Sequence, residues 1–186
     1  MPTTTKPSIL IVDDEPDVLF SLTGLLRRDF QVFTAKSGAE AMKVMAEQDV
    51  HVIMTDQRMP SMTGTELMGK VRAEHPDAVR IIFTGYADTR AVVDAINSGE
   101  LYRYISKPWD PDDLIEVLRD AAQKYNETIA EAKLLSGLDG YFDDAVSFVT
   151  SDEPAVRDAD AIETFKSRTE TLRTYLRLLK GSDARP

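Results

Sequence analysis

The chain has 186 residues, with 22 basic and 32 acidic side chains, a net charge of −10 and no cysteine. This length allows one domain with an appendage, or two very small domains. The lack of cysteine excludes disulfides, thiol catalysis and cysteine-ligated zinc, and the acidic balance disfavours nucleic-acid phosphates as partners. No apolar run approaches the length of a membrane span, and the Thr/Pro-rich start lacks the apolar centre of a signal peptide. We therefore expect a cytoplasmic protein with neither nucleic-acid nor membrane partners.

The first two-thirds of the chain alternate short apolar runs with amphipathic segments. Ile9 to Val12 is a continuous apolar run, typical of a strand buried on both faces. Further strands are predicted at 31–35, 50–55, 80–84 and 103–106. Helical spacing or helix caps predict helices at 16–28, 37–48, 63–75 and 89–98, and one more that starts at 111. Capping boxes at 37–40 and 63–66 mark two of these helix starts, and Asp110-Pro111 marks the last. Five strand-then-helix units with short loops predict a doubly wound α/β fold, with helices on both faces of a parallel sheet.

The last third of the chain is predicted to be helical. The helix from Pro111 meets no breaker before Gly137, an apolar-acidic segment follows at 139–150, and a final helix covers about 155–180. Apolar side chains recur at heptad-like spacing in both helices: Leu114, Leu118, Ala121, Tyr125, Thr128, Ala132 and Leu135, then Ile162, Phe165, Thr169, Leu172, Leu176 and Leu179. Two alternatives follow: the last helix folds back on the long one, or the two helices form a coiled-coil or four-helix homodimer.

Charged side chains gather where the predicted strands end. Asp13 and Asp14 follow the first strand, Asp56 the third, Thr84 ends the fourth, and Lys107 follows the fifth. The carboxyl ends of parallel strands share one edge of the sheet, where ligands bind. Three carboxylates at one edge repel one another unless a cation such as Mg²⁺ lies among them. A carboxylate there can also attack phosphorus and form an aspartyl phosphate, a reaction that depends mainly on charge neutralisation and positioning.

Four motifs carry a family resemblance. They are Val12-Asp13-Asp14-Glu15-Pro16, Thr55-Asp56-Gln57-Arg58-Met59-Pro60, Thr84-Gly85-Tyr86 and Tyr104-Ile105-Ser106-Lys107-Pro108. Together they resemble the receiver domain of two-component response regulators, over residues 8–124. The resemblance implies a flavodoxin-like sheet of strand order 2-1-3-4-5. It leaves residues 1–7 as a disordered arm and 125–186 as a helical extension for dimerisation or output.

The resemblance also implies the chemistry of the site. Asp56 would accept a phosphoryl group from a histidine kinase, in a reaction that depends on Mg²⁺. Asp14 would bind the metal directly, Asp13 largely through water, and the backbone carbonyl of Arg58 would be a third protein ligand. Arg58 lies at a position that modulates self-dephosphorylation in the family, so a slow rate is expected rather than the turnover of an enzyme.

The resemblance assigns a switch to three further residues. Thr84 would be the switch hydroxyl, Lys107 would bind the phosphoryl group, and Tyr104 would swing inward as Thr84 moves. Such a switch reshapes a surface for protein–protein contact. Trp109 lies near this surface and is either a packing residue or a docking anchor. His51 and His75 are interpreted as solvent-facing structural residues.

Other functions compete with this interpretation. The main alternative is that the chain is the regulatory N-terminal portion of a longer signalling enzyme or transcription factor. An aspartate-nucleophile phosphohydrolase is disfavoured. Those enzymes carry an Asp-x-Asp motif after the first strand, whereas here Asp13-Asp14-Glu15 follows it and the proposed acceptor follows the third strand. A DNA-binding transcription factor is disfavoured because the last 61 residues are acidic and contain no arginine-rich recognition helix.

Overall fold

The computed structural model describes residues 6–85, 101–150 and 159–182. The helix predicted at 89–98, most of the N-terminal arm and the first residues of the last predicted helix lie outside the described residues. The chain divides into two compact units, residues 1–125 and 126–186.

The first unit is built on one parallel sheet. Its strands are β1 (Ser8–Val12), β2 (Gln31–Ala35), β3 (Val52–Asp56), β4 (Val79–Thr84) and β5 (Arg103–Ser106). They lie in the order β2-β1-β3-β4-β5, which confirms the predicted doubly wound topology. In the sheet Val12 pairs with Thr55, Asp56 with Phe83, and Thr84 with Ser106. This register brings the carboxyl ends of four strands to one edge.

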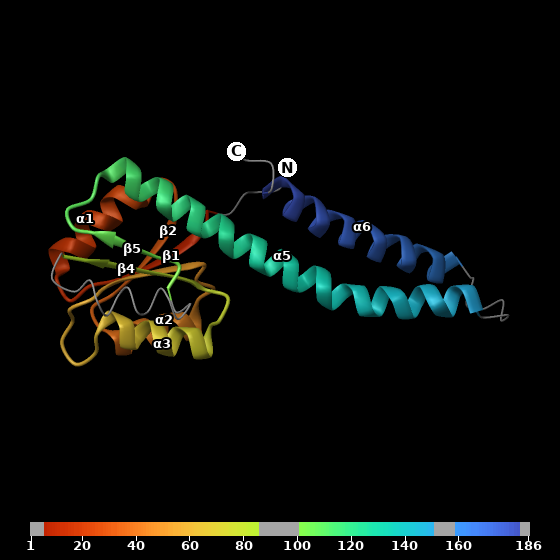
Figure 1. Ribbon diagram of the computed structural model, residues 1–186, viewed down its shortest axis with the longest axis horizontal. Helices are drawn as coiled ribbons and strands as arrows, with labels where there is room; N and C mark the ends of the chain where they lie inside the picture. Colours follow the sequence, from red (N-terminus) through yellow and green to blue (C-terminus); the bar gives the residue numbers. More distant parts are fainter. Residues whose placement is uncertain (1–5, 86–100, 151–158, 183–186) are drawn as a thin grey trace. The chain divides into compact units, whose positions relative to one another are not determined.

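Helices cover both faces of this sheet. Helices α2 (Gly38–Glu47) and α3 (Gly64–Glu74) lie on one face, whereas α1 (Pro16–Leu26) and the start of α5 (Pro111–Thr150) lie on the other (Figure 1). Alternate residues of β1 point to opposite faces, so Leu10 joins the core under α2 and α3, and Ile9 joins the core under α1 and α5. All five residues of β1 are buried, as the continuous apolar run predicts.

Polar side chains begin three of the helices. The hydroxyl of Thr63 accepts from the backbone N–H of Glu66, and the Glu66 carboxylate accepts from the Thr63 N–H, which completes the predicted capping box. At α2 the Ser37 hydroxyl accepts from Glu40, but the Glu40 carboxylate accepts from the N–H of Lys36. The carboxylate of Asp110 accepts from two N–H groups in the first turn of α5.

The second unit is a pair of helices. From Asn126 the unit contains the rest of α5, and α6 (Ala159–Ser182) runs back beside it (Figure 1). The rings of Tyr141 and Phe165 stack across the pair at 5.1 Å. The last helix therefore folds back along α5 within this chain.

The helix end expected at Gly137 is wrong, since α5 continues to Thr150. A Cβ atom on Gly137 would lie 2.7 Å from Cδ2 of Leu172 on α6. The glycine allows close approach of the two helices, so it marks a packing contact instead of a helix terminus. Within the described residues, no helix combines the length and hydropathy that a membrane crossing requires.

Candidate functional site at the carboxyl edge of the sheet

Asp56 is the last residue of β3 and is buried, with 9% of its surface exposed. Its Oδ1 accepts a hydrogen bond from the ammonium of Lys107 at 2.5 Å, and its Oδ2 accepts from the backbone N–H of Arg58 at 2.5 Å. Both oxygens are thus held by hydrogen-bond donors. The side chain cannot turn without breaking one of these bonds.

Asp13 follows β1 and is almost fully buried, with 1% of its surface exposed. Its Oδ1 accepts from the N–H of Glu15 at 2.8 Å. Its Oδ2 is buried, and among the described residues no hydrogen-bond donor reaches it. Burial raises the pKa of Asp13, while the Glu15 N–H and the charge of Lys107 act against this rise. An unsatisfied carboxylate oxygen in this position is a ready ligand for a cation.

Lys107 links the two carboxylates. Its backbone N–H donates to the carbonyl of Thr84 at 2.8 Å, which ties the residue after β5 to the end of β4. Its Nζ lies 3.6 Å from Oδ2 of Asp13 and 2.5 Å from Oδ1 of Asp56. The ring of Phe83 lies beneath the ammonium, with its centroid at 4.6 Å. One positive charge therefore offsets two buried negative charges, and the site keeps a net negative charge.

The remaining predicted residues lie less close together. Asp14 is exposed, and among the described residues there is no group of three or more acidic or histidine side chains arranged to hold a metal. Thr84 is buried at the end of β4, where its hydroxyl donates to the carbonyl of Gly85 at 3.2 Å. Tyr104 on β5 is 41% exposed, so its side chain reaches the surface.

Two supporting residues were missed in the sequence. The side chain of buried Gln57 accepts from the N–H of Thr65 at 3.1 Å, and its amide donates to the Thr65 hydroxyl at 3.3 Å. Gly64 donates its N–H to the carbonyl of Gln57, and a Cβ atom on Gly64 would collide with the carbonyl oxygen of Asp56. These contacts dock the first turn of α3 onto the backbone of the acceptor strand. A polar residue directly after a buried strand is the only signal for Gln57 that the sequence offers.

The other aromatic and histidine candidates pack inside the first unit. Trp109 lies edge-on against Phe83, with ring centroids 5.6 Å apart, which fits the packing alternative. His51 is not solvent-facing: its ring stacks on Tyr125 at 4.4 Å, and its Nδ1 accepts from the N–H of Ser8. His75 caps the C-terminus of α3.

Comparison with known sequences decides the family. The response regulator receiver domain matches residues 9–119. The chain belongs to this family. A hydrogenase transcriptional regulatory protein, HoxA, of Bradyrhizobium diazoefficiens is 39% identical over 118 residues, which is 63% of this chain and 24% of that protein. The DNA-binding transcriptional regulator NtrC of Escherichia coli is 30% identical over 64% of this chain and 25% of its own length. The chain thus spans about a quarter of the length of these relatives.

Solved structures agree with this assignment. A structure described as adenylate cyclase from Rhodopirellula baltica covers 70% of this receiver chain and 98% of its own, with 34% identity and a TM-score of 0.69. The response regulator TrrA of Thermotoga maritima, solved with Mg²⁺ and beryllofluoride, is 29% identical over 62% of this chain and 98% of its own, with a TM-score of 0.56. The fold and the family follow from these matches, whereas the role of each residue in this receiver rests on its own geometry.

Proposed function

We propose that this receiver accepts a phosphoryl group on Asp56 from a histidine kinase and thereby switches a protein-binding surface. The observation that carries the proposal is the position of Lys107, whose ammonium bridges the buried carboxylates of Asp56 and Asp13. Such a pair leaves a cation beside the oxygen to which phosphorus would bond.

The transfer balances without acid–base help from the protein. A carboxylate oxygen of Asp56 forms the O–P bond while the donor's P–N bond breaks, and the electron pair of that bond returns to the donor imidazole. Lys107 can then pair with a phosphoryl oxygen in place of the carboxylate oxygen it holds before transfer. Positioning and charge neutralisation are the main requirements of such a step.

We infer that the acidic residues of the site bind Mg²⁺. The proposed ligands are the carboxylates of Asp13, Asp14 and Asp56 and the backbone carbonyl of Arg58. The fit rests on the buried Oδ2 of Asp13, for which the described residues offer no hydrogen-bond donor, and on the excess of negative charge around Lys107. When bound, the metal supplies positive charge to the carboxylates and to a phosphoryl oxygen.

The metal proposal predicts a stability change. Mg²⁺ should raise the melting temperature of the wild type, because it binds the folded state and relieves repulsion among the carboxylates. Asp14→Ala should abolish this rise, whereas Asp17→Ala should keep it, because Asp17 is an exposed acid in the first turn of α1. A differential scanning measurement with and without Mg²⁺ tests this. An equal response in all three proteins would count against the site.

The switch requires contacts that differ between the two states. We assign it to Thr84, Tyr104 and Lys107, at the ends of β4 and β5. Moving a two-state equilibrium from 1:99 to 99:1 takes about 5.5 kcal/mol of differential interaction. Charge-assisted hydrogen bonds from Thr84 and Lys107 to the phosphoryl group, at about 1.5–3 kcal/mol each, are of the right size. The side chain of Tyr104, which reaches the surface, is the element that would move.

The output of the switch is proposed to be contact with another protein. The transcriptional regulators among the relatives support a second candidate, in which this receiver regulates a longer protein that binds DNA. The acidic balance of the chain itself argues against direct DNA binding by these 186 residues. Salt-dependent binding of DNA to this chain would contradict that argument and favour direct DNA binding.

The decisive experiment is phosphorylation by a small-molecule donor such as phosphoramidate, followed by intact-mass measurement. We expect the wild type to gain one phosphoryl group in the presence of Mg²⁺ and to lose it on treatment with hydroxylamine, as an acyl phosphate does. Asp56→Ala should gain none, and Asp17→Ala should behave as the wild type. A hydroxylamine-sensitive gain that persists in Asp56→Ala would refute the assignment of the acceptor.

A further inference from the structure

The described side chains of the second unit's helix pair are mostly half-buried or exposed. Among its described side chains only Ala130 is fully buried, and seam residues such as Phe165 and Leu172 are half-buried. Leu135 and Phe142 are 59% and 58% exposed, and Leu176 is 42% exposed. An apolar helical stripe is stable only when another element covers it, and two helices cannot cover both sides of their own seam.

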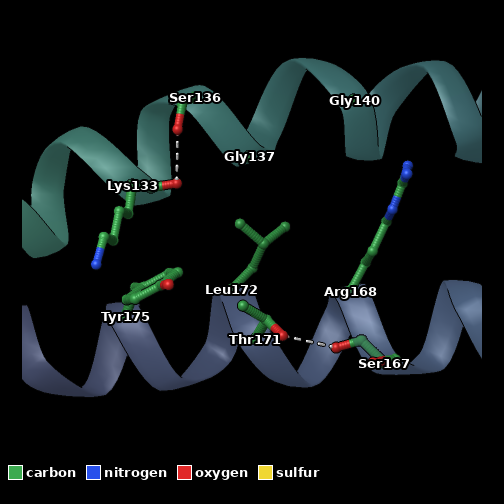
Figure 2. A pocket seen from close by; sticks show the side chains of 9 residues that line it. All are labelled: Lys133, Ser136, Gly137, Gly140, Ser167, Arg168, Thr171, Leu172 and Tyr175. Atoms are coloured by element: carbon green, nitrogen blue, oxygen red, sulfur yellow. Dashed lines mark hydrogen bonds between the residues drawn. The ribbon is translucent and has the colours of Figure 1, made fainter.

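The two sides of the seam differ in character. Figure 2 shows one side, where Leu172 points at Gly137, Arg168 extends toward Gly140, and polar side chains surround a hollow of about 480 Å³. On the other side lies a second hollow of about 370 Å³. We call this the apolar groove; it is lined by Leu134, Leu138, Tyr141 and Phe142 of α5 and by Thr169, Leu172, Arg173 and Leu176 of α6.

The two helices also carry opposite charge. Residues 126–150 contain five acidic side chains and one basic side chain, whereas α6 contains five basic and three acidic ones. An acidic helix beside a basic helix is favourable, and within the described part of the second unit each helix has one such neighbour. The opposite flank of each helix would gain from a second neighbour of opposite charge.

We propose that the apolar groove binds the same groove of a second copy of this chain, forming an antiparallel four-helix bundle with twofold symmetry. In this arrangement the α5 segment lies between its own α6 and the α6 of the second copy, so every neighbouring pair of helices joins an acidic and a basic helix. In the bundle, the second copy covers Leu135, Phe142 and Leu176 and removes them from contact with water. The proposal goes beyond phosphoryl transfer and does not depend on Asp56.

The experiment begins with the mass of the full chain in solution, measured by light scattering over a wide range of protein concentration. We expect a dimer in the wild type and equally in Asp56→Ala, with or without Mg²⁺ and beryllofluoride. Because the helices attract by charge, the dissociation constant should rise with salt. A wild type that stays monomeric at every concentration would overturn the proposal while leaving phosphorylation of Asp56 untouched.

A matched pair of substitutions on α6 locates the interface. Leu176→Glu places a charge in the apolar groove and should raise the dissociation constant at least about tenfold. Thr174→Glu adds the same charge at an exposed position two residues away, outside the groove lining, and should leave the dimer intact. Equal effects of the two, with helix content unchanged by circular dichroism, would overturn the proposal.

The absence of cysteine provides a test that leaves the groove chemistry nearly intact. Leu135→Cys and Ser136→Cys introduce single thiols at adjacent positions, both exposed in one chain. In the proposed bundle the thiol at 135 is covered by the second copy, and the thiol at 136 stays accessible. We expect the first to react with a thiol reagent several-fold more slowly at high protein concentration than at low, and the second to show no such dependence. Concentration-independent labelling at position 135 would contradict the bundle.

Discussion

The two units of this chain differ in how completely they bury their apolar side chains. In the receiver unit a five-stranded sheet is covered on both faces, and every residue of β1 is buried. In the second unit the helices α5 and α6 share a single seam, and Ala130 alone among the described side chains is fully buried. Burial of apolar area is the main favourable term in folding, so we expect the first unit to be the more stable of the two and the second to gain stability from an element that covers it.

Helix α5 crosses both units, so Leu→Ala substitutions along it test this contrast. They should give the largest change in the free energy of unfolding. Leu118 is fully buried against the sheet, whereas Leu138 lines the apolar groove and is half-buried. Leu118→Ala should lower the free energy of unfolding of the receiver unit by about 2–5 kcal/mol. Leu138→Ala should leave it almost unchanged. The single tryptophan, Trp109, packs on Phe83 in the receiver core, so its fluorescence in a urea titration follows that unit.

Comparing two signals, circular dichroism and Trp109 fluorescence, shows which unit each substitution destabilises. Circular dichroism reports both units, so Leu138→Ala should lose helix signal at lower urea than the wild type while the Trp109 transition stays in place. If both substitutions moved the Trp109 transition equally, the receiver and the helix pair would unfold as one cooperative unit, and the proposed contrast would fail.

A smaller effect is expected from two glycines of α3. A Cβ atom on Gly64 would collide with the backbone at Asp56, whereas nothing lies within 4 Å of a Cβ atom on Gly69. Gly64→Ala should therefore destabilise the receiver by about 1–3 kcal/mol, because backbone must move to admit the methyl group. Gly69→Ala, at an exposed position inside the helix, should stabilise it by about 0.5–1 kcal/mol. Urea titrations of the two variants measure the sign of each change in the free energy of unfolding. A stabilising Gly64→Ala would contradict the close docking of α3 on the acceptor strand.

The sequence predicted most of the receiver because its rules are local. Alternating apolar runs and caps predicted the strands β2 and β5 to the residue, and the ends of strands brought Asp13, Asp56 and Lys107 to one edge. It could not predict the 2.5 Å contact between Lys107 and Asp56, because residues 51 positions apart meet only through the order of the strands.

The errors have the same origin. Gly137 was interpreted as a helix breaker because helix propensity is local, while its reason in the structure is the side chain of Leu172 on another helix. Gln57 was passed over because its hydrogen bonds to Thr65 depend on how the loop after β3 turns. His51 was interpreted as solvent-facing, although Tyr125, 74 positions later, covers its ring.

The smallest expected effect concerns His51, whose ring stacks on Tyr125, the last residue of the receiver unit. Burial lowers the pKa of His51 below its usual value of 6.5, and the nearby charge of Asp49 only partly opposes this. As the pH falls through 6.5 the unfolded chain takes up the proton first, so the free energy of unfolding decreases toward acid. This contribution is fully present above the unfolded pKa and is lost as the pH falls toward the lower folded pKa.

His51→Asn isolates this contribution, since an amide oxygen can still accept from the N–H of Ser8 and does not titrate. Between about pH 7.5 and about pH 5.5 the urea midpoint of the variant should fall less than that of the wild type. Tyr125, whose pKa burial and Asp49 raise to about 12, stays protonated throughout this range and adds no slope of its own. The Trp109 signal therefore compares the two slopes directly, and identical slopes would mean that the ring of His51 is as solvated in the folded receiver as in the unfolded chain.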